Sequence, residues 1–150
     1  NNSSDQASVP EGNLVHGLRF MEPAHVDGLT IRRCDGSGGM IIRNNYIRVD
    51  PNRATGALFI QAWGGHIDNV LIEGNFLQGY GHCLALEYNE HGYGSNMRAI
   101  NNRFDAWTVD GGGPWYTTVA GGDGWAAWED NYVYDEEASA DDYRGAAVDE

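Results

Sequence analysis

Apolar and polar residues alternate in short runs along this chain, and an asparagine stands at the same point of each run. An apolar residue lies two positions after each asparagine. Before each of the last four asparagines, further apolar residues lie three and five positions upstream. Alternation with a period of two is the pattern of a β-strand that buries one face. The asparagines are Asn13, Asn45, Asn75, Asn102 and Asn131, at intervals of 32, 30, 27 and 29 residues. The apolar residues after them are Val15, Ile47, Leu77, Phe104 and Val133, and those before them are Ile42, Ile72, Ala99 and Trp128, then Met40, Val70, Met97 and Ala126.

A third apolar stretch precedes each of the last four asparagines by 14 to 18 residues, at 29–31, 58–60, 84–86 and 117–119. Three strands in each repeat of about thirty residues predict an all-β fold, a right-handed parallel β-helix (a solenoid) of about four coils plus a partial first coil. Asparagine suits the corner because it tolerates a positive φ, and stacked asparagines can hydrogen-bond between coils. The rival fold is an antiparallel sandwich, which does not require one corner residue in every repeat.

The repeat also divides the chain. We expect residues 13–135 to form the β-helix. Residues 1–12 are polar, and they are either an N-terminal segment or the remnant of a cap over the first coil. Residues 136–150 are acidic and rich in alanine, and they are either a tail or a short C-terminal cover.

The charge of the chain limits the classes of partner that it can bind. The formal net charge is −13, and all nine cations are arginine. This acidity argues against nucleic acid and anionic membranes, and a polyanion would need Ca²⁺ or a local arginine. No apolar run is long enough to span a membrane, and no leader sequence is visible, although a mature secreted form remains an option. Cys34 and Cys83 fall about two coils apart, roughly 9.6 Å, so two free thiols are expected.

Several stretches resemble secreted right-handed parallel β-helix repeat proteins of the pectin-lyase-like superfamily. They are 25–31 (HVDGLTI), 41–47 (IIRNNYI), 56–61 (GALFIQ), 69–75 (NVLIEGN), 102–104 (NRF) and 130–132 (DNY). The resemblance implies an extracellular protein with a shallow groove for sugar polymers along the first strand of each coil. The same fold also serves non-catalytic surface modules.

The resemblance favours some activities over others. Polygalacturonase-type relatives carry a Gly-His-Gly and an Arg-x-Lys. Here Gly81 and His82 are followed by Cys83, and the chain has no lysine, which speaks against that hydrolysis. Lyase relatives use an arginine or lysine base with Ca²⁺ or another positive group. If the protein is an enzyme, a polysaccharide lyase is therefore favoured over a glycoside hydrolase, with no required cofactor and with Ca²⁺ possible.

Connection lengths of 12, 8 and 14 residues between the corner asparagines and the next strands predict a saddle between coils two and three. Its walls would be 48–55 and 105–115, and its floor Phe59, Gln61, Ala85 and Glu87. Aromatic side chains stack on sugar rings, but they can equally seal loops. The candidate substrate-binding residues are Gln61, Arg32, Tyr88, Trp107, Trp115 and Tyr116, with Trp63 nearby.

The candidate catalytic residues are Glu87, His82, His25 and Asp27, and no metal ligands are predicted. His25 and Asp27 could act as base and orienter, or Asp27 could simply cap the turn before Leu29. The register places Asp27 in one column with His82 and about 19 Å from Glu87, beyond the carboxyl spacing of glycosidases. It also places Arg32, Gln61, Glu87 and Ala120 in one column.

Two functions remain open from the sequence. The first is an extracellular module that binds a polysaccharide in the saddle and, in its enzymatic form, cleaves it. The second is a non-enzymatic structural or assembly module that stacks its open first coil on itself or on a missing cap region.

Overall fold

The computed structural model describes residues 10–18, 27–34, 38–49, 56–79, 82–87, 94–105, 115–118, 125–134 and 144–147. Fourteen β-strands in these ranges form three sheets. The same ranges contain no helix, and so none that could cross a membrane.

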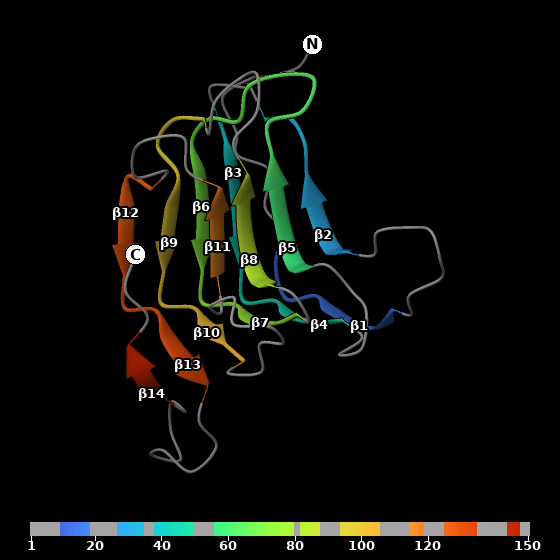
Figure 1. The fold of residues 1–150 in the computed structure, drawn as a ribbon, viewed down its shortest axis with the longest axis vertical. Coiled ribbons are helices and arrows are strands. Elements are labelled where there is room, and N and C mark those ends of the chain that lie inside the picture. Colours follow the sequence, from blue (N-terminus) through green and yellow to red (C-terminus); the bar gives the residue numbers. More distant parts are fainter. Residues whose placement is uncertain are drawn as a thin grey trace.

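Each sheet collects every third strand of the first thirteen, and the fourteenth strand joins one of these sheets beside the thirteenth (Figure 1). Sheet 1 contains β2 (Asp27–Ile31), β5 (Gly56–Gln61), β8 (His82–Glu87) and β11 (Trp115–Thr118). Sheet 2 contains β3 (Met40–Arg43), β6 (Val70–Glu73), β9 (Arg98–Ile100) and β12 (Ala127–Glu129). Sheet 3 contains β1 (Leu14–Leu18), β4 (Tyr46–Val49), β7 (Phe76–Gln78), β10 (Arg103–Phe104), β13 (Tyr132–Tyr134) and β14 (Arg144–Ala147).

The strands of each sheet run parallel, with β13 and β14 as the one antiparallel pair among the described strands. In Figure 1 the strands of sheet 1 point upward, β6, β9 and β12 point downward, and the early strands of sheet 3 lie along the lower edge. The prediction of an all-β fold with parallel strands is confirmed, and the antiparallel sandwich is wrong for this part of the chain.

The five asparagines stack in one column, as their spacing predicts. The residues two positions after them pair in sequence, from Val15 and Ile47 through Leu77 to Phe104 and Val133. Each asparagine from the second to the fifth accepts, at its side-chain oxygen, hydrogen bonds from the backbone N–H and the amide group of the preceding asparagine, all at 2.9–3.1 Å. These four asparagines are buried, and their shared amides join neighbouring strands at the corner between sheets 2 and 3.

The left-handed backbone conformation is not at these asparagines, contrary to the prediction. It lies one residue earlier in every repeat, at Gly12, Asn44, Gly74, Asn101 and Asp130, with φ between 52° and 68°. Glycine, asparagine and aspartate are the residues that adopt this conformation most readily. The turn is therefore made by the preceding residue, which leaves the stacked asparagine free to direct its amide inward.

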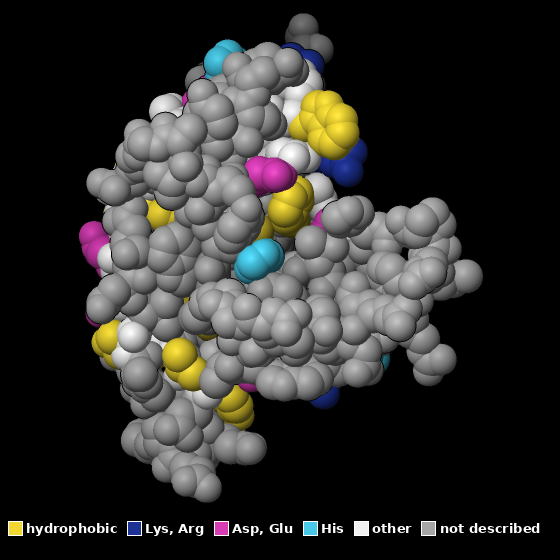
Figure 2. Space-filling model, viewed as in Figure 1, with side chains coloured by type: hydrophobic (Ala, Val, Ile, Leu, Met, Phe, Trp, Pro, Cys, Tyr) yellow, Lys and Arg dark blue, Asp and Glu magenta, His cyan; other side chains and the backbone are white. Residues whose placement is uncertain are grey.

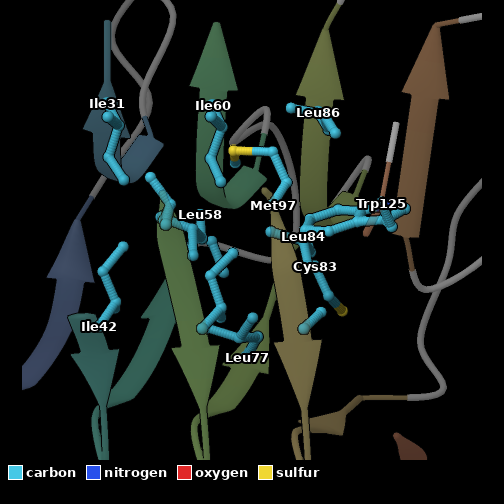
Figure 3. Packing of buried hydrophobic residues seen from close by; sticks show 14 of the residues in the cluster. Ile31, Ile42, Leu58, Ile60, Leu77, Cys83, Leu84, Leu86, Met97 and Trp125 are labelled. Carbon is cyan, nitrogen blue, oxygen red and sulfur yellow. The ribbon is translucent and has the colours of Figure 1, made fainter. Parts of the chain in front are cut away.

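The core lies between the three sheets. Ile31, Ile60 and Leu86 are buried side by side on successive strands of sheet 1, and Figure 3 shows Leu58 and Leu84 forming the next row. Columns from sheets 2 and 3 complete the core, including Ile42, Ile72, Ala99, Ile47, Leu77 and Phe104. These are the inward positions that the alternating pattern predicts.

The last repeat differs from the prediction in two places. The predicted alignment set residues 117–119 against 84–86. In the structure Trp115 of β11 pairs with Leu84, so the alignment is wrong by two residues because the strand begins earlier. Ala126 is exposed, and Trp125 is buried in its place. The carbonyl of Met97 accepts hydrogen bonds from the N–H groups of both Ala126 and Ala127. Two residues of one strand then face one residue of its neighbour, which is the arrangement of a β-bulge.

The parts outside the predicted repeat also pair with it where they are described. Gly12 N–H donates to the carbonyl of Arg43, and Arg43 N–H donates to the carbonyl of Pro10. The Arg43 side chain forms an ion pair of 2.8 Å with Glu11. Near the other end, β14 lies against β13. Cys34 and Cys83 are not joined in a disulfide, as predicted.

Candidate functional site

The outer face of sheet 1 carries the described candidate residues, and its alternation is interrupted once. Ala57 and Leu58 are both part of the core, as are Cys83 and Leu84. Because two successive residues point inward, the residues on either side of them point outward. The outer face therefore has three columns: Asp27, Gly56 and His82; then Thr30, Phe59 and Ala85; then Arg32, Gln61 and Glu87.

The third of these columns is a row of polar side chains, Arg32, Gln61 and Glu87, which we call the polar row. Gln61 pairs with Glu87 across β5 and β8, and its Nε2 donates a hydrogen bond to Glu87 Oε2. Arg32 directly follows Ile31, which pairs with Ile60, so it lies beside Gln61 at about the 4.8 Å strand spacing. Arg32 and Glu87 are then about 9.6 Å apart, two strand spacings.

Trp63 adds an aromatic surface to the polar row. The Arg32 guanidinium lies over its ring, 5.3 Å from the ring centroid, and 61% of the Trp63 residue is exposed. A cation held over an indole face is an attractive arrangement that also orients the ring. Figure 2 shows hydrophobic, basic and acidic side chains together near the upper ends of the sheet 1 strands.

Asp27 and His82 lie in the same column at the starts of β2 and β8, as predicted. Asp27 Oδ2 accepts a hydrogen bond of 3.4 Å from Thr30 Oγ1. Partial burial lowers the pKa of His82, which favours a neutral imidazole. Burial raises the pKa of the neighbouring Cys83 thiol to about 12, so this group is a packed thiol and not a nucleophile.

The described catalytic candidates do not meet at one point. His82 and Asp27 are two strand spacings apart, about 9.6 Å. His82 and Glu87 are five residues apart on one strand, about 16 Å, and the register leaves Asp27 and Glu87 about 19 Å apart. A base must lie within hydrogen-bonding reach of its partner group or of a bridging water. His25 lies outside the described residues.

The binding candidates divide in a similar way. The structure brings Gln61 and Glu87 together and places Arg32 beside them, whereas Thr118, not Ala120, continues their column on β11. Tyr88, Trp107 and most of both predicted walls lie outside the described residues, as do the side chains of Trp115 and Tyr116. Ala85 is 0% exposed, so this part of the predicted floor is covered.

The contact between Arg32 and Trp63 is the feature that the sequence reasoning missed. Trp63 follows the strand end by two residues, where the alternation no longer fixes the direction of a side chain. The available signal was a cation and an exposed aromatic residue at nearby positions of consecutive repeats.

Among the described residues, no three His, Cys, Asp or Glu side chains come close enough together to hold a metal ion. Comparisons of this chain with protein-family models, with curated proteins and with solved structures gave no match.

Proposed function

We propose that the three sheets are the faces of a right-handed parallel β-helix of the pectin-lyase-like type, with about four coils and a partial first coil. The rotation of successive strands through three sheets supports this, because a solenoid advances one strand per sheet in each turn. The buried asparagine column supports it further, because the same corner recurs in all five repeats.

We also propose that the protein is extracellular and binds a polysaccharide on the outer face of sheet 1, at the polar row and Trp63. The observation that carries this proposal is the pairing of an exposed tryptophan with Arg32, beside the hydrogen-bonded Gln61 and Glu87. Sugar rings stack their C–H faces on aromatic rings, while planar amides and carboxylates hydrogen-bond their hydroxyl groups. The polar row offers both kinds of contact over three neighbouring strands.

Binding is favoured over cleavage because the described acid and base candidates are about 9.6 to 19 Å apart. If cleavage occurs, we propose a lyase reaction, with Arg32 as the available base and Ca²⁺ to compensate the charge of −13 when an acidic polymer binds. An assay for new reducing ends and for unsaturated products separates binding, hydrolysis and elimination.

A glycan array tests the binding proposal. Trp63→Ala should weaken binding by about tenfold, the loss of roughly 1.4 kcal/mol of stacking and apolar contact. Tyr46→Ala is the control, because Tyr46 is another exposed aromatic residue, on sheet 3. If no polymer binds, or if the two variants lose affinity equally, the proposal is wrong.

The alternative proposal is a non-enzymatic assembly module. β1, β2 and β3 are the terminal strands of their sheets among the described residues, and 64% of Leu14 on β1 is exposed. Terminal strands present backbone groups that can pair with another chain. Sedimentation at high concentration tests this: Leu14→Lys should abolish any association of the wild type, and a wild type that stays monomeric contradicts it.

A further inference from the structure

The charge environment of Arg32 is unusual for this chain. The sequence has 22 acidic and 9 basic side chains, so an exposed arginine has many carboxylates available to it. Arg32 nevertheless forms no ion pair or hydrogen bond with any described residue, and its contact there is the face of Trp63. A guanidinium whose neighbour is a ring face makes no hydrogen bond to that face, so its N–H groups stay available to bind a carboxylate or sulfate.

The other end of the polar row has the opposite charge. Glu87 is partly exposed, and Gln61 occupies only one of its two oxygens in a hydrogen bond. Gln61 itself is uncharged and lies between Glu87 and Arg32. The row therefore changes from positive to neutral to negative over three residues whose Cα atoms span about 9.6 Å.

We propose that the polar row selects glycans by the number and position of their acidic groups. Arg32 holds one acidic group of the ligand, and Glu87 repels an acidic group at the other end of the row. The preferred ligand is then a mostly neutral glycan with an isolated carboxylate or sulfate, and a polymer with a uronate at every sugar is disfavoured. This inference rests on the proposed glycan binding at sheet 1.

The magnitudes make this selection measurable. A hydrogen bond to a charged group contributes about 1.5 kcal/mol or more, so the loss of the Arg32 contact should weaken binding of a singly acidic glycan by about tenfold. Two like charges about 4 Å apart repel by about 1 kcal/mol even at the dielectric constant of water, which is about fivefold in affinity. Salt should reduce the second effect strongly, because the site is at the surface.

An array tests this inference if it presents each oligosaccharide backbone in three forms: neutral, with one uronate or sulfate, and with a uronate at every sugar. The wild type should bind the singly acidic form best. Arg32→Gln should lower binding of that form about tenfold, to the level of the neutral one. Glu87→Gln should raise binding of the fully acidic form about fivefold at low salt. Arg103→Gln is the matched control, because Arg103 also lies over an aromatic ring, that of Tyr132, but on sheet 3.

The outcomes separate this inference from the proposed function. If the wild type binds neutral or fully acidic glycans as well as singly acidic ones, selection by charge is wrong and glycan binding stands. The inference is equally wrong if Arg32→Gln and Arg103→Gln behave alike. If no form of any backbone binds, both the glycan site and its charge selection are rejected.

Discussion

Truncation of a central asparagine should reveal how much the buried column contributes to stability. Asn75 makes four side-chain hydrogen bonds. Its Oδ1 accepts from the backbone N–H and the Nδ2 of Asn45, at 3.0 and 2.9 Å, and its Nδ2 donates to the Ile42 carbonyl and to Asn102 Oδ1, at 2.9 and 3.0 Å. Because Asn75 is only 1% exposed, water cannot easily replace these partners.

Asn75→Ala removes all four bonds and leaves their partners buried. At about 1 kcal/mol per bond, the free energy of unfolding should fall by about 4 kcal/mol, within a range of roughly 2 to 6. That is a large part of the 5–15 kcal/mol typical of a folded domain. With a urea m-value of about 2 kcal/mol/M, the unfolding midpoint should fall by about 2 M.

Asn13→Ala is the matched control, because Asn13 belongs to the same column but is exposed. Its Nδ2 donates to Asn45 Oδ1 and to the Glu11 carbonyl, where water can take its place. We expect a loss below about 1 kcal/mol. The measurement is urea unfolding of the wild type and both variants, followed by circular dichroism. Equal midpoints for the two variants, or a loss below 1 kcal/mol for Asn75→Ala, would refute the reasoning that burial makes the column stabilising.

Two further predictions concern a glycine and a thiol. Gly39→Ala should lower the free energy of unfolding more than Gly12→Ala does in the same urea assay. Both glycines have positive φ, which costs alanine about 1–2 kcal/mol, but of the two only Gly39 would bring its added Cβ against a backbone atom, the Asn69 carbonyl oxygen. A further loss of about 1–3 kcal/mol is expected for Gly39→Ala, and equal losses would contradict this. Burial raises the pKa of the Cys83 thiol to about 12, so Cys83 should react with a thiol reagent at pH 8 only after unfolding. The partly exposed Cys34 should react in the native protein. Equal reaction rates of the two thiols in the native protein would show that the Cys83 environment is open.

The parallel architecture was predictable because two features of each repeat indicate which side chains point inward: the apolar alternation and the position of the asparagine. A one-residue slip would turn every apolar side chain of a strand outward, so the register of Ile47, Leu77 and Phe104 is strongly specified. The positive φ was assigned to the wrong residue because Asn44 and Asn45 are both asparagines, and the sequence does not say which makes the turn. The pattern of Gly12 and Gly74 at the preceding position was the signal that resolves it.

The burial of Trp125 in place of Ala126 has a different physical origin. A bulge adds one residue to one strand, and it changes which side chain is buried without changing the composition. Ala126 fits the alternating pattern, yet Trp125 is buried, and its ring lies 5.2 Å from that of Trp128. A large aromatic residue gains more from burial than alanine does, which favours the bulge.

The candidate site was predictable only as far as the strands extend. Within β5 and β8 the register fixes which residues face one another, so the contact of Gln61 with Glu87 followed from the sequence. Beyond the strand ends no periodicity remains, and the contact of Trp63 with Arg32 depends on how the chain turns after Gln61. The most informative part of the site is therefore the part with the least regular backbone. Its chemistry comes from side chains at the ends of strands, whose positions are fixed by the regular core beneath them.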